Sequence, residues 1–152
     1  MAIFTIRDRF AQPVWAGILR ALAAVAAGLL LASAFPGPLS GERGSWLAWV
    51  ALVPLILLAI FTPPRPAFIW GFTAGWIFWL VSLSWLLKLI QTSLAPWPLA
   101  VLGWVSLSAY AALFFGLFTA SVSFLTRTLG TNNPFINTGL TFLIAALWVG
   151  CE

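Results

Sequence analysis

The chain has 152 residues, of which 62% are hydrophobic and only 7% are charged. Soluble domains carry about 25% charged residues, so this composition excludes a soluble globular fold and indicates a domain that lies in a lipid bilayer. With no histidine and one cysteine, His/Cys metal sites and disulfide frameworks are excluded as well. The net charge of +4 does not indicate a nucleic-acid partner, because the basic residues stand singly between long apolar runs.

The charged residues separate apolar segments that are long enough for membrane helices, which need about 20 apolar residues each. Such segments are far too long for the strands of about 10 residues that build membrane barrels. The sequence therefore predicts one all-α domain over residues 1–152, a polytopic bundle of about five transmembrane helices. The predicted helices cover residues 14–35, 46–61, 67–90, 99–125 and 135–152.

Prolines and glycines set the ends of these helices, because neither residue continues a helix easily. The first helix ends at Phe35-Pro36-Gly37-Pro38, and the second ends before Pro63-Pro64-Arg65-Pro66. Pro54 lies inside the second helix and predicts a kink there. Pro96 and Pro98 mark the break before the fourth helix, and Thr131-Asn132-Asn133-Pro134 marks the turn before the fifth.

The distribution of basic residues predicts a cytoplasmic N-terminus, because cytoplasmic loops carry the excess of Lys and Arg. In that orientation Arg7, Arg9, Arg20, Arg65 and Arg127 lie inside, while Arg43 and Lys88 lie outside. The predicted helices then cross the membrane several times.

The first helix has an alternative interpretation as a cleaved signal peptide. The apolar stretch Ala21–Leu31 is followed by Ala32-Ser33-Ala34, which fits a signal-peptidase site. A retained helix is favoured because Val14–Leu19 adds apolar length before Arg20. N-terminal sequencing of the mature protein distinguishes the two, and a start at Phe35 would exclude the retained helix.

Few residues can carry chemistry, and we expect no catalytic residue, metal ligand or cofactor in this chain. The three acidic residues, Asp8, Glu42 and Glu152, are far apart in sequence, so a paired-carboxylate site has no support. Cys151 and Glu152 are neighbours, yet adjacent helix residues point about 100° apart. Cys151 is therefore interpreted as a packing residue. Glu152 marks either the water interface or the start of a polar site.

Aromatic residues recur on one side of the third predicted helix at helical spacing, namely Phe68, Phe72, Trp76 and Trp79. Packing or contact with lipid explains them most simply. The functional alternative is a wall for a bound acyl chain, which makes Phe72, Trp76, Trp79 and Glu152 the weak candidates for substrate binding.

Small and hydroxyl residues in the helices are assigned to structure. Gly71 and Gly75 form a small-xxx-small pair, which predicts close helix packing. The serines can donate hydrogen bonds to their own helix backbone, so none needs a substrate. These serines are Ser82, Ser84, Ser106, Ser108, Ser121 and Ser123.

Four motifs occur in a recognisable order along the chain. They are Ala34-Phe35-Pro36-Gly37-Pro38, Trp46-Leu47-Ala48-Trp49-Val50-Ala51-Leu52-Val53-Pro54-Leu55, Gly71-Phe72-Thr73-Ala74-Gly75 leading to Trp85, and Leu147-Trp148-Val149-Gly150-Cys151-Glu152. In this order and spacing, from about residue 20 onward, the chain resembles the N-terminal membrane part of bacterial apolipoprotein N-acyltransferases.

The resemblance implies a multi-pass protein of the bacterial cytoplasmic (inner) membrane, with eight membrane helices and a nitrilase-like domain outside the cytoplasm. Such enzymes transfer an acyl chain from phospholipid to the N-terminal cysteine of a diacylglyceryl lipoprotein, through a Glu-Lys-Cys triad. None of that triad maps onto this chain, and neither Cys151 nor Glu152 replaces it. The resemblance therefore predicts a fragment, a truncated product or one piece of a split enzyme, inactive alone.

The partners that the resemblance implies are a membrane phospholipid, a lipoprotein reached through the absent domain, and a separate catalytic chain if the enzyme is split. An alternative of another class is a small membrane scaffold or half of a dimeric transporter. Transporters usually place charged or strongly polar groups at mid-membrane. Here only Ser, Thr and Tyr110 offer polarity, which disfavours transport but leaves a scaffold open.

Overall fold

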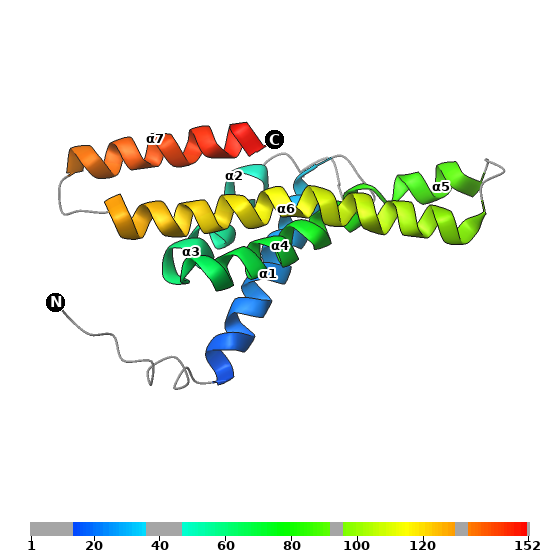
Figure 1. Cartoon of the computed structure of the whole chain (residues 1–152), viewed down its shortest axis with the longest axis horizontal. Helices are drawn as coiled ribbons and strands as arrows, with labels where there is room; N and C mark the ends of the chain where they lie inside the picture. The colour runs from blue at the N-terminus through cyan, green and yellow to red at the C-terminus, as the bar shows by residue number, and fades with distance from the viewer. Residues whose placement is uncertain (1–13, 36–46, 92–95, 130–133, 152) are drawn as a thin grey trace.

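The computed structural model of the chain describes residues 14–35, 47–91, 96–129 and 134–151 (Figure 1). Within these residues all regular structure is helical, which confirms the predicted all-α class. The helices are α1 (Val14–Ala34), α2 (Ala48–Ala51), α3 (Val53–Phe61), α4 (Pro64–Ser82), α5 (Trp85–Gln91), α6 (Trp97–Leu129) and α7 (Pro134–Cys151).

Two predicted helices are each interrupted by a short break. Pro54 lies in the first turn of α3, directly after the break at Leu52. Proline has no N–H for the carbonyl of Val50 and its ring crowds the preceding turn, so the kink predicted at Pro54 separates α2 from α3. A turn at Leu83 and Ser84 separates α4 from α5, which the sequence analysis did not anticipate.

The described helices differ in whether they are long enough to cross a membrane. Three stretches are long and apolar enough, namely Trp15–Ala34, Pro64–Lys88 and Trp97–Leu129. The stretch through α2 and α3 is shorter than the roughly 20 residues that a bilayer requires. The apolar part of α7, Asn137–Gly150, is also shorter.

The centre of the bundle is the close antiparallel contact between α4 and α6. A side chain at Gly71 would collide with the Thr119 hydroxyl of α6, and its Cβ would lie 2.9 Å from the Phe115 carbonyl. A Cβ at Gly75 would lie 2.6 Å from the Phe115 side chain. The predicted packing role of the Gly71–Gly75 pair is thus confirmed, because only residues without a side chain permit this approach.

Hydroxyl groups of α6 hold the start of α4 and the end of α3. Thr119 Oγ1 lies 2.9 Å from the carbonyl oxygen of Ala67, and Ser123 Oγ donates to the carbonyl of Thr62 at 2.5 Å. Pro66 has no N–H with which to reach back to Thr62. The Ser123 hydroxyl therefore satisfies a buried carbonyl that its own helix leaves open.

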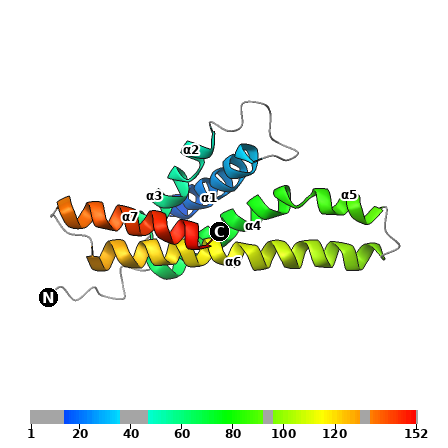
Figure 2. The same ribbon diagram turned by 90° about the horizontal axis from the view of Figure 1, so that it is seen from above.

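The other helices pack around this α4–α6 pair. α1 crosses α4 through small residues, and a Cβ on Gly28 would lie 2.6 Å from the Ala74 carbonyl oxygen. Figures 1 and 2 both show α7 beside the second half of α6 and α5 beside its first half. Trp148 holds α7 in place, since its ring centre lies 5.3 Å from that of Phe115 and 5.1 Å from that of Phe118.

Candidate functional site

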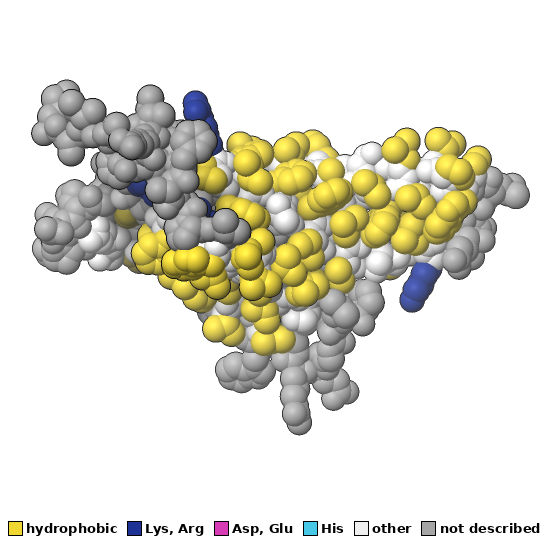
Figure 3. All heavy atoms as spheres, turned by 90° about the horizontal axis from the view of Figure 1, so that it is seen from below, with side chains coloured by type: hydrophobic (Ala, Val, Ile, Leu, Met, Phe, Trp, Pro, Cys, Tyr) yellow, Lys and Arg dark blue, Asp and Glu magenta, His cyan; other side chains and the backbone are white. Residues whose placement is uncertain are grey.

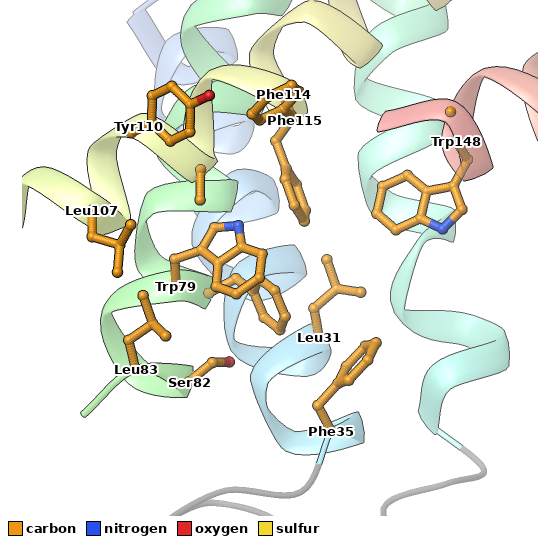
Figure 4. Close-up of a pocket in the computed structure, with 13 residues that line it drawn as sticks. Leu31, Phe35, Trp79, Ser82, Leu83, Leu107, Tyr110, Phe114, Phe115 and Trp148 are labelled. Atoms are coloured by element: carbon orange, nitrogen blue, oxygen red, sulfur yellow. The ribbon is translucent and has the colours of Figure 1, made fainter. Parts of the chain in front are cut away.

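A pocket of about 700 Å³ lies where the ends of α1, α4 and α7 meet the middle of α6 (Figure 4). Its volume falls within the roughly 300–1,000 Å³ typical of ligand sites. We call it the apolar pocket, because its lining is almost entirely hydrophobic. The lining residues are Leu31, Phe35, Phe78, Trp79, Ser82, Leu83, Leu107, Tyr110, Ala111, Phe114, Phe115, Trp148 and Gly150.

Interlocking aromatic rings fix the shape of the apolar pocket. Phe78 of α4 makes edge contacts with Phe35 and Trp79, at centroid distances of 5.5 and 5.0 Å. It also packs against Phe115 of α6 at 5.6 Å, and Phe115 in turn contacts Trp148. Such pairs each contribute about 0.5–1.5 kcal/mol beyond area burial. The walls from α1, α4, α6 and α7 are therefore joined through one cluster.

Two polar atoms in the pocket lining lack a hydrogen-bond partner within the described part of the chain. They are Trp79 Nε1 and Ser82 Oγ, both buried and one helical turn apart on α4. Figure 4 shows both side chains at the pocket. A buried polar group without a partner destabilises a fold by about 1–3 kcal/mol. These two atoms therefore offer hydrogen bonds to a group inside the pocket.

The predicted aromatic wall is divided in the structure. Phe68 and Phe72 stack at 6.4 Å, and Phe72 and Trp76 pack at 6.0 Å, away from the pocket lining. Trp79 alone of the four lines the pocket. The next residue in the i, i+4 series after Trp76 is Leu80, so the ladder stops, and Trp79 packs on Phe78 instead.

The remaining candidate residues lie beyond what the structure describes. Glu152 is outside the described residues, and of Cys151 only the backbone is described. Substrate binding by Phe72, Trp76, Trp79 or Glu152 stays a prediction. Among the described residues, no group of His, Cys, Asp and Glu could hold a metal ion.

The serines follow the sequence prediction only in part. Ser108 Oγ donates to the Trp104 carbonyl at 2.8 Å, one turn back on its own helix, as expected. Ser123 instead bonds across to Thr62, and Ser82 has no partner within the described residues. The general assignment of these hydroxyls to their own helix is therefore wrong for Ser82 and Ser123.

Sequence reasoning missed most of the apolar pocket, including Leu31, Phe35, Tyr110 and Phe115. Their positions are spread over α1 and α6, and hydrophobic residues fill both helices. No local pattern marks them, since the site exists only where four helices converge. The one available signal was a polar pair, Trp79 and Ser82, on a single face of an otherwise apolar helix.

Residues 27–152 match the family described as the apolipoprotein N-acyltransferase N-terminal domain. The chain belongs to the apolipoprotein N-acyltransferase family. It is 36% identical over 134 residues to the apolipoprotein N-acyltransferase of Geobacter metallireducens, covering 86% of this chain and 23% of that protein. It is 35% identical over 134 residues to the apolipoprotein N-acyltransferase of Gloeobacter violaceus, covering 84% of this chain and 25% of that protein.

The chain spans about a quarter of the length of these two N-acyltransferases. The family match begins inside α1 and includes every residue that lines the apolar pocket, from Leu31 to Gly150. The pocket is therefore formed wholly by the family's N-terminal domain. Together with the apolar helices, this membership identifies a membrane protein.

Proposed function

We propose that this chain is the membrane part of an apolipoprotein N-acyltransferase. The enzyme would transfer a fatty acyl chain from phospholipid to the N-terminal cysteine of diacylglyceryl lipoproteins. In this proposal the apolar pocket receives an acyl chain of the donor phospholipid. The observation that supports it is an apolar cavity, in a chain of this family, with two polar atoms that have no hydrogen-bond partner among the described residues.

The chemistry of the pocket suits an acyl ester. A fatty acyl chain is apolar over its length and carries one carbonyl at its end. The aromatic and aliphatic walls accept the chain, while Trp79 Nε1 and Ser82 Oγ can donate hydrogen bonds to the ester carbonyl. Leu107 and Tyr110 are substantially exposed along α6, so this wall offers the pocket a side entry from the bilayer.

Photo-crosslinking tests this assignment. A phospholipid with a diazirine in its acyl chain, added to the intact enzyme in membranes, should label peptides that contain Trp79–Leu83 or Leu107–Phe115. Ala111→Trp should fill the pocket and reduce both labelling and acyl transfer, whereas Leu99→Trp on the exposed start of α6 should change neither. Absence of labelling in α4 and α6 would contradict the proposal.

We propose that the acyl-transfer chemistry lies outside residues 1–152. No Glu-Lys-Cys triad of the family's type maps onto the chain. Purified residues 1–152 should therefore not acylate a diacylglyceryl peptide with phospholipid as donor. Mixing with the remaining part of a relative should restore transfer, if the two parts associate. Acylation by the chain alone would contradict this division.

A multi-pass placement in the bacterial cytoplasmic membrane, with the N-terminus inside, is part of the same proposal. Arg20, Arg65 and Arg127 lie at the end of the bundle where α1 and α4 begin and α6 ends. Lys88 lies near the opposite end, in the last turn of α5. This asymmetry follows the positive-inside rule.

A further inference from the structure

A second cavity lies far from the apolar pocket, between the first half of α1 and α3. It is a groove of about 510 Å³, and we call it the α1–α3 groove. The two helices run in opposite directions (Figures 1 and 2), so the start of α1 lies beside the end of α3. Its walls are formed by residues 15–23 of α1 and by residues 53–62 at and just beyond α3.

The floor and walls of the groove are apolar and open to the surroundings. Leu19 of α1 and Leu57 of α3 both line it, and each side chain is about half exposed, at 54% and 48%. Leu19 belongs to Trp15–Ala34, a stretch that is long and apolar enough to cross a membrane, so lipid is a more suitable occupant of the α1 side of the groove than water. A hydrocarbon chain is the complement of such a surface.

One cation lines the groove, and others lie at the same end of the bundle. Arg20 of α1 contributes directly to the lining. Arg65, three residues beyond Thr62, and Arg127, in the last turn of α6, are both exposed at this end. Figure 3 shows Lys and Arg atoms near the two ends of the molecule with a hydrophobic surface between them. The charged side chains that the structure describes at this end are all basic, which favours an anionic partner.

We propose that the α1–α3 groove is a binding site for an anionic phospholipid of the leaflet at the basic end. The lipid phosphate pairs with Arg20, and Arg65 adds to the attraction. One acyl chain lies along the groove between Leu19 and Leu57. Arginine suits this place because its aliphatic stem packs on an apolar helix while its guanidinium reaches the headgroup region and forms two parallel hydrogen bonds to phosphate.

The position of Trp15 supports this depth in the bilayer. Its indole lines the groove and is 63% exposed at the start of α1. Tryptophan concentrates at the level of lipid headgroups, and Arg20 lies little more than one turn further along the helix. The groove therefore begins at headgroup depth and continues towards the hydrocarbon.

This site is separate from the proposed donor pocket. It shares no lining residue with the apolar pocket and lies at the other end of the bundle. Its α1 wall, residues 15–23, precedes the part of the chain that matches the family. The proposal therefore does not depend on the acyl-transfer function, and a lipid held here serves to anchor α1 against α3.

Native mass spectrometry of the intact, delipidated protein tests the proposal. Dioleoyl phosphatidylglycerol, dioleoyl phosphatidylcholine and inorganic phosphate are titrated in parallel against the wild type and three variants. Arg20→Gln removes the phosphate partner, and Leu57→Trp fills the groove from an exposed position that tolerates substitution. Lys88→Gln, at the opposite end, is the matched control.

We expect phosphatidylglycerol to bind more tightly than phosphatidylcholine and phosphate not to bind. Arg20→Gln should weaken phosphatidylglycerol about ten-fold, the effect of losing a charge-assisted hydrogen bond. Leu57→Trp should weaken both lipids, and Lys88→Gln should weaken neither. Equal binding of the two lipids would overturn the proposal, as would equal effects of Arg20→Gln and Lys88→Gln. Binding of phosphate without binding of either lipid would indicate a free-anion site and would overturn the proposal. Lipid binding that Leu57→Trp leaves unchanged would indicate that the groove is filled by protein, and this result would also overturn the proposal.

Discussion

Glycine at position 71 determines how closely α4 and α6 approach. We expect Gly71→Ala to destabilise the bundle by about 1–3 kcal/mol, the usual effect of overpacking. The new methyl group would press on the Thr119 hydroxyl and the Phe115 carbonyl, and the backbone carbonyl cannot rotate away. Unfolding in a denaturing detergent titration measures the loss.

Gly103 on α6 supplies the control for this substitution. A Cβ there meets nothing within 4 Å, so Gly103→Ala should be neutral or stabilising by up to about 1 kcal/mol through helix propensity. Equal effects of the two substitutions would show that the α4–α6 contact is not set by Gly71.

A single hydroxyl in α6 satisfies the carbonyl at the α3–α4 junction. Ser123→Ala removes the hydrogen bond to Thr62, a residue that is 1% exposed, and leaves its carbonyl buried without a partner. We expect a loss of about 1–2 kcal/mol in the free energy of unfolding. Ser106→Ala, at an exposed position of the same helix, should change it by less than about 0.5 kcal/mol. A neutral Ser123→Ala would mean that another group reaches this carbonyl.

For single residues, the sequence predicted close helix packing better than it predicted the hydrogen-bond partners of hydroxyl groups. The Gly71–Gly75 spacing indicates a close helix contact whatever the partner, because a flat surface is useful to any neighbour. The partner of a serine hydroxyl depends on which carbonyl lies across the interface. Ser123 and Ser82 could not be assigned, since the Pro66-dependent gap at Thr62 and the pocket beside α4 appear only after folding.

α7 is attached to the bundle mainly through α6. Its outer face is open, with Phe142 73% exposed, and Trp148 makes its two ring contacts with α6. Trp148→Ala removes both contacts, each worth about 0.5–1.5 kcal/mol, so transient opening of α7 should increase at least about five-fold. Hydrogen exchange of the α7 amides measures this opening.

Phe142→Ala provides the comparison on the same helix. That side chain touches little, so exchange should stay within about two-fold of the wild type. If Trp148→Ala behaves in the same way, α7 is held by contacts other than the Phe115–Phe118–Trp148 cluster.

The elements themselves were largely predictable, because charges and prolines divide the chain so clearly. α1 (Val14–Ala34) lies almost where the sequence placed it, at residues 14–35. The start of α4 at Pro64 shows the limit of proline as a breaker, since the first turn of a helix needs no N–H donors and accepts proline. The break at Leu83 and Ser84 carries no proline or glycine, so no sequence signal marked it.

Among the residues that the structure describes, Arg20, Arg65 and Arg127 lie towards one end of the molecule and Lys88 lies near the other, which predicts its direction in the membrane. In a Cys151→Ser background, Pro96→Cys at the start of α6 should react with an impermeant maleimide added outside spheroplasts. Thr128→Cys at the other end of α6 should react only after lysis. The reverse pattern would place the N-terminus outside.

The pocket belongs to this scale too, and this explains why sequence could not predict it. The sequence placed Trp79 on the correct helix but grouped it with Phe72 and Trp76, which do not line the pocket. A helical wheel shows which residues share a face of one helix, but it does not show which other helices pack against that face. The residues opposite it, Phe35 and Phe115, come from helices far away in sequence. Only the crossing of α1, α4, α6 and α7 gives them a common cavity.

The length of α6 has a consequence for how the protein meets its bilayer. Its 33 residues extend about 50 Å at 1.5 Å per residue, whereas the hydrocarbon layer is about 30 Å thick. Even a steep tilt of about 40° accommodates only about 39 Å. If α6 crosses the membrane, about two of its turns therefore lie in the headgroup layer. Trp97 suits that layer. Leu99 and Leu102, whose side chains are both more than 60% exposed, would instead favour the hydrocarbon. A thicker membrane would submerge these leucines and draw α6 more upright, so the depth at which Tyr110 meets the lipid depends on membrane thickness.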